Sequence, residues 1–186
     1  MRPTLRLAGL LVALSAPAAH AVEYHTVLPA QSTLAFEFRQ MGVPVKGGFK
    51  RFATALRFDP AQPEAGRARI EIDLGSIDAG SPEADEEAAG KLWFNRNVFP
   101  KATFVSREVR ALGGNRYALH GTLTLKGKSR PLTVPVTYTP GREVATFDGA
   151  FVLKRLDFGI GEGMWADVSA VANEVRVKFR IAARGN

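Results

Sequence analysis

The sequence predicts an all-β domain with one short helix, built as an antiparallel barrel or a sandwich. Segments 67–74 and 174–181 alternate charged and apolar residues, the pattern of strands with one face in water and one face turned inward. Turn signals such as Gly113-Gly114-Asn115 separate about eight segments of this kind, and links this short join antiparallel neighbours. The apolar interior could be a filled core or a lined cavity.

One of the expected strands is irregular. The strands cover residues 34–39, 45–49 continuing to 53–58, 67–74, 102–111, 117–125, 132–138, 145–153 and 174–183. In the second of these, the inward phase changes near Lys50-Arg51, which predicts a bulge or bend of the kind that barrel closure requires. Gly47-Gly48 would ease the same bend. A closed barrel would also remove the exposed edge of the long last strand.

One helix is expected between Ser81 and Gly90. Ser81 is a good N-cap, Pro82 suits the first helical position, and the glycine marks the end. Glu83, Asp85, Glu86 and Glu87 could suggest a metal cluster, but no histidine accompanies them. We interpret them as acids that complement the helix dipole and face solvent, and no metal site is expected.

The first 21 residues have the layout of a secretory signal peptide. Arg2 and Arg6 precede the apolar run 7–14, and Ala19-His20-Ala21 has the small-x-small form of a cleavage site. The alternative is an uncleaved anchor. Cleavage after Ala21 leaves residues 22–186, which are 186 − 21 = 165 residues and suit one domain. The sequence therefore predicts export.

Composition narrows the possible functions. The formal charge of +7 falls to +5 without the two arginines of the signal segment, and solvated strand faces account for the excess more simply than binding to anionic lipid headgroups. Basic residues do not alternate with aromatic ones as they do in proteins that bind single strands, so no nucleic-acid partner is expected. The chain has no cysteine, which excludes thiol chemistry and iron–sulfur clusters.

Few residues could support catalysis. After cleavage only His25 and His120 would remain, and strand phase places the second on the outward face. No Gly-x-Ser-x-Gly elbow or nucleotide-binding loop is present. Asp73 and Asp78 are interpreted as turn-capping residues, and the glycines of 159–163 as a mobile loop. We expect a protein that is not an enzyme, with no catalytic residue and no cofactor.

The apolar inventory is the strongest positive signal. Twelve phenylalanines, two tryptophans and three tyrosines serve one domain, and a barrel of about eight strands can be filled or can hold one small ligand. The apolar segments Leu92-Trp93-Phe94 and Met164-Trp165 lie outside the strands, as a lid or rim would. The candidate cavity lining is Phe36, Phe38, Phe49, Ile70, Ile72, Trp93, Phe94, Phe104, Leu123, Val134, Phe151, Phe158, Trp165, Val177 and Phe179.

Several short motifs resemble those of the YceI-like family, in order along nearly the whole chain after residue 30. They are Gln31-Ser32-Thr33-Leu34-x-Phe36, Gly47-x-Phe49, Asp73-x-x-Ser76-Ile77, Asn95-x-x-x-Phe99-Pro100-x-Ala102-x-Phe104-x-Ser106, Gly121-x-Leu123-Thr124-Leu125-Lys126-Gly127-x-x-x-Pro131-Leu132 and Phe158-Gly159-Ile160-Gly161. One departure is Leu92-Trp93-Phe94-Asn95, where many relatives have a shorter Asp-Phe-Phe-like segment. This departure concerns the shape of the cavity mouth.

The resemblance implies a lipocalin-like, extended antiparallel barrel of eight strands in the periplasm. It also implies a tunnel that holds a polyisoprenoid, an isoprenoid quinone or a similar amphiphile, for transport, storage or stress response. A membrane quinone-oxidising cytochrome is an implied partner, and a homodimer is compatible with the resemblance. No catalytic residue is implied. The alternatives are a hydrolase or isomerase acting on lipid inside the barrel, which needs an inward titratable group, and a module that binds partners through a basic surface.

Overall fold

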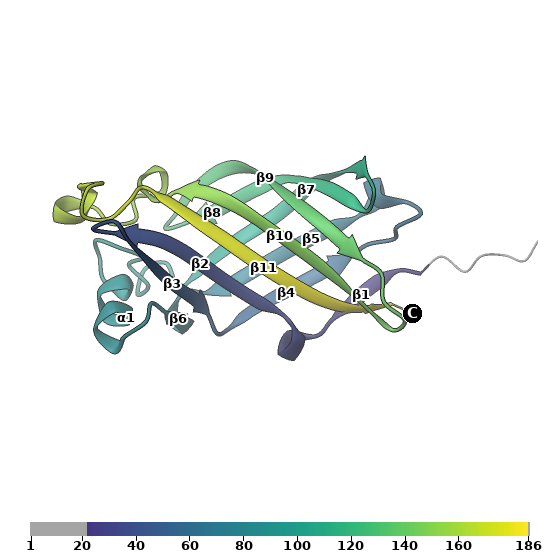
Figure 1. Cartoon of the computed structure of the whole chain (residues 1–186), viewed down its shortest axis with the longest axis horizontal. Coiled ribbons are helices and arrows are strands. Elements are labelled where there is room, and N and C mark those ends of the chain that lie inside the picture. The colour runs from purple at the N-terminus through teal and green to yellow at the C-terminus, as the bar shows by residue number, and fades with distance from the viewer. Residues whose placement is uncertain (1–21, 186) are drawn as a thin grey trace, which may run out of the picture.

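A computed structural model describes residues 22–185 and shows a curled antiparallel sheet with one helix (Figure 1). Its strands are β1 (Tyr24–Val27), β2 (Thr33–Gln40), β3 (Val43–Phe49), β4 (Phe52–Arg57), β5 (Arg67–Asp73), β6 (Ile77–Asp78), β7 (Lys101–Gly113), β8 (Arg116–Leu125), β9 (Lys128–Thr139), β10 (Val144–Lys154) and β11 (Glu174–Gly185). The helices are α1 (Pro82–Ala89) and the 3₁₀ turns η1 (Pro29–Gln31), η2 (Pro63–Ala65), η3 (Leu74–Ser76), η4 (Arg155–Phe158) and η5 (Gly163–Ala166). The expected signal segment 1–21 lies outside the described residues. Within 22–185, no helix is long and apolar enough to span a membrane.

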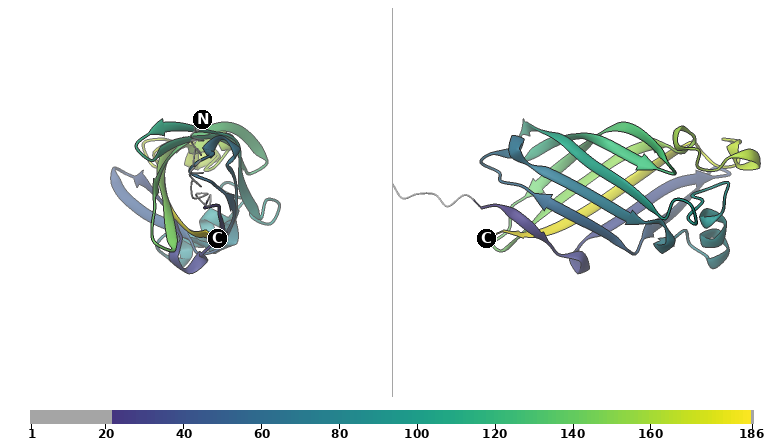
Figure 2. Two further views of the ribbon diagram at one scale, coloured as in Figure 1. Left: turned by 90° about the vertical axis from the view of Figure 1, so that its right-hand side faces the viewer. Right: turned by 180° about the vertical axis from the view of Figure 1, so that it is seen from behind.

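The strands form a ring, so the structure is a barrel and not a sandwich. Eleven strands follow the order β4-β5-β7-β8-β9-β10-β11-β2-β3-β6, with β1 beside β11. β3 pairs with β2, while β4, which continues it, pairs with β5. If β3 and β4 count as one bent strand and the short β1 and β6 are set aside, the eleven become the predicted eight. Figure 2 shows the ring from one end.

The bend between β3 and β4 confirms the predicted phase change. The hydroxyl of Ser76 accepts a hydrogen bond from the Arg51 amide at 2.9 Å and donates to the Asp73 carbonyl at 2.7 Å. The Lys50 amide donates to the Ser76 carbonyl, and the Asp73 amide donates to the Arg51 carbonyl. Ser76 is 3% exposed, so its hydroxyl is a buried polar group whose hydrogen bonds are satisfied. The bend is therefore pinned by the segment that follows β5.

All eight expected strands and the helix are confirmed, with small changes of bounds. α1 begins after the N-cap Ser81, whose side chain accepts from the Ala84 amide, and ends at Gly90. Arg176, Lys178 and Arg180 are exposed as predicted, while Val177 and Phe179 between them turn inward. The two-residue β6 and the four-residue β1 were not predicted. Both are too short to show periodicity, and their position depends on β3 and β11.

One end of the barrel is filled by aromatic rings. Tyr24, Phe58, Tyr138 and Phe147 are each at most 7% exposed, and the Phe58 ring lies 5.1–5.4 Å from the rings of Tyr117, Tyr138 and Phe147. The Tyr138 hydroxyl donates to the Tyr24 hydroxyl at 3.1 Å. We call these five residues the aromatic plug. The buried rings pack edge to face or tilted against one another, so they fill this end of the barrel.

The plug should make stability fall in alkaline solution. The pKa of Tyr138 lies above its ordinary value of about 10, mainly because the hydroxyl is buried and also because it is hydrogen-bonded to Tyr24. The native state then keeps a proton that the unfolded chain loses, so the unfolding free energy decreases as pH rises above about 10. Tyr138→Phe should cost about 1 kcal/mol at neutral pH through the lost hydrogen bond. Urea unfolding of both proteins should show this gap shrinking towards about pH 11; a constant gap would contradict the argument.

Candidate ligand tunnel

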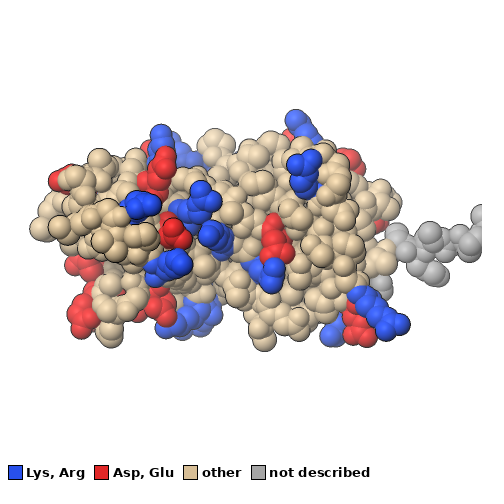
Figure 3. Space-filling model, viewed as in Figure 1, with Lys and Arg blue, Asp and Glu red and all other residues tan. Residues whose placement is uncertain are grey.

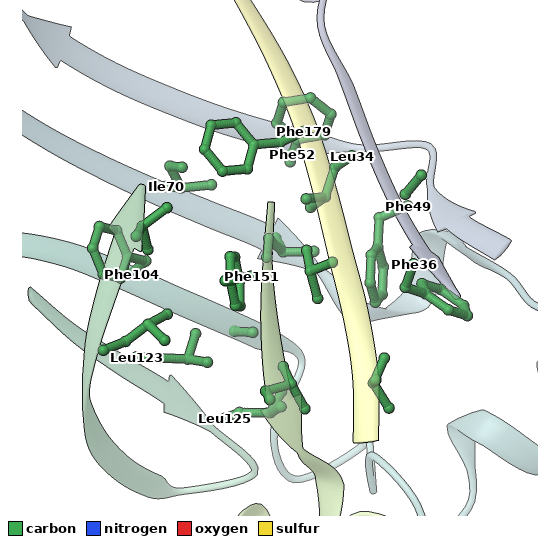
Figure 4. A pocket seen from close by; sticks show the side chains of 18 of the residues that line it. Leu34, Phe36, Phe49, Phe52, Ile70, Phe104, Leu123, Leu125, Phe151 and Phe179 are labelled. Carbon is green, nitrogen blue, oxygen red and sulfur yellow. The ribbon is translucent and has the colours of Figure 1, made fainter. Parts of the chain in front are cut away.

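The other part of the interior is hollow. A cavity of about 450 Å³ extends between the strands, and Figure 4 shows apolar side chains pointing into it from opposite walls. Inward residues such as Phe36, Ile70 and Phe179 are only half-buried, although they lie on the inner face of the sheet. A side chain that points inward yet stays partly accessible faces internal space. The interior is therefore both a filled core and a lined cavity.

Fourteen of the fifteen predicted residues line this tunnel. They are Phe36, Phe38, Phe49, Ile70, Ile72, Trp93, Phe94, Phe104, Leu123, Val134, Phe151, Trp165, Val177 and Phe179. Phe158 is the exception: it is 4% exposed and belongs to the packed core, but it does not line the tunnel. It lies in η4, outside the strands, so alternation could not show which way its side chain points. A ligand-binding role for the fourteen stays a prediction.

Three glycines give phenylalanine rings room against the wall. Gly149 lies opposite Phe179, and Gly47 lies opposite Phe36 on the neighbouring strand. A Cβ atom at either glycine would overlap the ring, and at Gly121 it would lie 2.6 Å from Cζ of Phe104. Each ring therefore covers a glycine of the adjacent strand, as in aromatic rescue of a strand glycine. Rings held against the wall leave the bore of the tunnel open.

Gly149→Ala should narrow the tunnel. The added methyl group would push the Phe179 ring into the lumen, with an overpacking cost of about 1–3 kcal/mol in unfolding free energy. Lipid uptake should fall together with stability. The control is the double variant Gly149→Ala/Phe179→Leu, which removes the ring and should recover uptake, while stability recovers only in part because the new methyl group still lies 2.6 Å from the Pro135 carbonyl oxygen. Uptake that is unchanged in the single variant would show that these rings do not set the bore.

The end opposite the plug is covered by what we call the cap: α1, segment 90–98 and loop 155–173 (Figure 1). The indole N–H groups of Trp93 and Trp165 both donate to Oε1 of Glu87, at 3.1 and 2.7 Å. The two rings lie 5.6 Å apart, and both line the tunnel. This confirms that the aromatic residues outside the strands lie over the end of the cavity. One carboxylate on α1 holds them together.

A buried arginine organises the cap. Arg155 is 2% exposed, and burial lowers the pKa of its guanidinium from the ordinary value. Its Cζ lies 5.7 Å from the centre of the Trp93 ring. The guanidinium donates at 2.6–3.1 Å to five backbone carbonyls, those of Ile160, Gly161, Trp165, Val171 and Ala172. The loop around 159–163 is therefore tightly held, and our interpretation of it as mobile was wrong.

Arg155→Lys should loosen the cap, because an ammonium has three donors and cannot serve five carbonyls. We expect a loss of about 3 kcal/mol in unfolding free energy. Amide exchange should accelerate within 159–172 and stay unchanged in the aromatic plug. The matched control is Arg130→Lys, an exposed arginine with one long bond of 3.4 Å to the Asp157 carbonyl, expected to change stability by less than about 0.5 kcal/mol. Equal effects of the two substitutions would contradict this role.

The titratable residues considered for catalysis face away from the tunnel. His120 lies 2.9 Å from the Thr133 hydroxyl and does not line the cavity. Asp73 accepts from the Gly75 amide and pairs with Arg51, which keeps the pKa of its carboxyl below the usual range. Asp78 pairs with Lys50. Among residues 22–185, no group of three or more His, Cys, Asp or Glu side chains could hold a metal ion.

Two polar features of the tunnel were not foreseen. Thr54 lines the tunnel from β4. Its hydroxyl is buried and has no hydrogen-bond partner, unlike the other buried side-chain polar atoms in the described part of the chain. The second feature is Arg155, which comes directly after β10, where strand alternation no longer predicts the direction of a side chain. In the sequence, only the spacing of Gly159, Gly161 and Gly163 pointed to a loop that an arginine could organise. All three glycines have positive φ, and the carbonyls of the loop turn towards one point.

An antiparallel barrel around an elongated apolar cavity is the architecture of lipocalin-like proteins that enclose a small ligand. The family model described as the YceI-like domain matches residues 25–183. The chain therefore belongs to the YceI-like family, as its motifs suggested.

Known relatives agree with this assignment. A UPF0312 protein of Vibrio cholerae is 29% identical over 169 residues, which cover 86% of this chain and 89% of that protein. A UPF0312 protein of Shewanella oneidensis is 30% identical over 138 residues, covering 70% and 72%. The matched regions cover most of the length of this chain and of both relatives.

Solved structures share the fold. Burkholderia cenocepacia BcnA is 43% identical, with a TM-score of 0.83 over 84% of this chain and 99% of that one. A Campylobacter jejuni YceI protein has a TM-score of 0.70 at 21% identity over 76% and 85% of the two chains. A polyisoprenoid binding domain from Saccharophagus degradans, implicated in plant cell wall breakdown, has a TM-score of 0.66 at 16% identity over 90% and 100%. The last two likenesses concern the fold alone.

Proposed function

We propose that this protein binds a polyisoprenoid lipid, such as an isoprenoid quinone, in the tunnel. The observation that carries the proposal is a hollow of about 450 Å³ lined mainly by Phe, Leu, Ile and Val. Transfer of a prenyl chain from water into such a site is favourable by about 0.8 kcal/mol per CH₂-sized group. The fold neighbour named as a polyisoprenoid binding domain supports the same ligand class.

The size of the cavity suits a chain of moderate length. A cavity of about 150 Å³ holds benzene, so a cavity about three times larger has room for roughly 18 carbons, or three to four isoprene units. A longer chain would need the cap or the wall to move. Charged residues that line the tunnel lie at its ends, Arg57 and Arg67 near the plug and Glu83, Glu87 and Arg155 in the cap. The middle of the tunnel suits a hydrocarbon without charge.

The wider role follows from the ligand and from the signal-like N-terminal segment. We propose that the protein acts in the periplasm as a lipid carrier, store or stress-response sink, with a quinone-oxidising membrane cytochrome as a candidate partner. The barrel itself would need no cofactor for this function. Exposed basic residues alternate with acids on the face in Figure 3, which is compatible with a protein that moves freely between partners.

Binding explains the structure better than catalysis. A hydrolase or isomerase acting inside the barrel requires a titratable group that faces the lipid. His120 and Asp73 face outward and have partners there. Glu83 and Glu87 line only the cap end of the tunnel, and Glu87 accepts hydrogen bonds from two indole N–H groups. Membership of the YceI-like family and the named binding domain among the fold neighbours also favour a binding protein.

The proposal is tested by two substitutions on opposite faces of β10. Phe151 lines the tunnel, while its neighbour Val152 is 46% exposed. Phe151→Asp places a charge in the apolar lumen and should weaken lipid binding by about a hundredfold, whereas Val152→Asp should leave it unchanged. Circular dichroism would confirm that both variants fold.

Binding itself is measured by native mass spectrometry of protein purified without detergent, and by uptake of all-trans-retinol and an added isoprenoid quinone. Co-purified lipid or uptake of either probe supports the proposal. Reproducible absence of lipid together with no uptake would refute it, as would equal effects of the two aspartates.

A further inference from the structure

Both ends of the tunnel are closed by hydrogen bonds. At the plug, the amides of Tyr24 and Phe58 each donate to the carbonyl of the other residue, at 2.8 and 3.0 Å. At the cap, the amides of Gly161 and Glu162 donate to the Leu92 carbonyl. Arg155 adds its five bonds to the same end. A ligand that entered end-on would have to break several of these bonds.

The wall of the barrel is weaker in two places. β4 pairs with β5 on one side, but along Phe52–Arg57 its other edge has no paired strand. β9 pairs with β10 only through residues 136–139, so residues 128–135 also have one unpaired edge. A two-residue turn joins β8 to β9, with Leu125 and Lys128 as the closing pair. Counted from that pair, the backbone nitrogens of Pro131 and Pro135 point away from β8 and towards β10. Proline has no N–H, which explains the missing pairing there.

The first of these unpaired edges adjoins a sizeable groove. This groove, of about 910 Å³, lies outside the barrel between β4 and the start of β2. Leu34, Phe49 and Phe52 line both the groove and the tunnel, so these three side chains form the partition between them. Figure 4 shows them on the same side of the tunnel. We call this stretch of wall the seam.

The second unpaired edge is bridged by side chains. Lys126 donates to the Gly159 carbonyl at 2.6 Å and pairs with Glu162 at 2.9 Å, while Arg130 reaches the Asp157 carbonyl. These contacts join the β8–β9 hairpin to the cap. Along the free edge of β4, the ion pair of Arg57 with Glu23 lies at the end near the plug. Among the described residues, no side-chain hydrogen bond or ion pair crosses this edge beside Leu34, Phe49 and Phe52, so we infer that the seam opens more easily than the second edge.

We propose that the lipid chain enters and leaves the tunnel sideways through the seam, while its polar head stays in the groove. The groove suits such a head because it carries the exposed hydroxyl of Thr33 and seven charged side chains. These are Lys46, Lys50, Arg51, Lys101, Glu71, Asp73 and Asp78. Moving three apolar side chains breaks no hydrogen bond between strands, because the edge of β4 beside them is already unpaired, and the head never has to enter the apolar lumen. This inference rests on the proposed lipid-binding function and adds the route.

The absence of cysteine from the chain makes the route testable. Thr33 and Ala53 are exposed and line the groove from opposite sides of the seam. Thr33→Cys and Ala53→Cys would each be labelled with a bulky maleimide. Matched labels would be placed through Val152→Cys, beside the second unpaired edge, and Met164→Cys, on the cap; these side chains are 46% and 77% exposed. Uptake and release of all-trans-retinol are then followed by its fluorescence, with the unlabelled variants as controls.

Labels at Thr33 and Ala53 should slow both uptake and release by about tenfold or more, while labels at Val152 and Met164 leave both rates unchanged. Slowing by the Met164 or Val152 label without slowing at the seam would overturn the side route. Equal rates in all four labelled proteins would overturn it as well. If the unlabelled protein bound neither retinol nor quinone, the proposed lipid-binding function itself would fail. If it bound them and the labels left the rates unchanged, only the side route would fail.

Discussion

The corner at Lys50-Arg51 is the constraint on which the rest of the barrel depends. One strand has to serve two neighbours there, with β3 paired to β2 and β4 paired to β5. Ser76 and Asp73 supply the hydrogen bonds that a straight ladder would otherwise provide, and the Arg51–Asp73 ion pair at 2.9 Å covers them. The Asp-x-x-Ser-Ile motif therefore has a structural role. It turns the sheet so that the ring can close.

The same corner creates the weakness beside it. Once β4 turns towards β5, it leaves β2, and no other strand reaches its free edge until Phe58 meets Tyr24. Natural sheets usually cover or close such an edge. Here apolar side chains cover it from inside, and a charged groove lies outside. The geometry that closes the barrel and the geometry that leaves a soft place in its wall thus have one origin.

Sequence reasoning succeeded where a local rule applies. Alternation located the long strands and which way Phe179 and Lys178 point, the phase change located the corner, and capping rules placed α1. It failed for Arg155 and Phe158, whose surroundings come from segments that meet only after folding. Five carbonyls from two stretches of one loop converge on Arg155, and no periodic pattern records that convergence. Alternation also cannot distinguish a hollow interior from a full one, because both need the same inward residues.

The difference between hollow and full lies instead in which strand positions carry no side chain. Along the tunnel, Phe36, Phe104 and Phe179 spread over Gly47, Gly121 and Gly149 and stay near the wall. At the plug, a Cβ atom at Gly66 or Gly185 would meet the rings of Phe58 and Tyr24 only at ordinary contact distances of 3.4 and 3.5 Å, and the rings of Tyr24, Phe58 and Tyr138 pack against one another. Stability is thereby concentrated in the plug and in the cap around Arg155. The stretch between them can hold a space, because the two ends supply the packing and hydrogen bonds that the hollow part lacks.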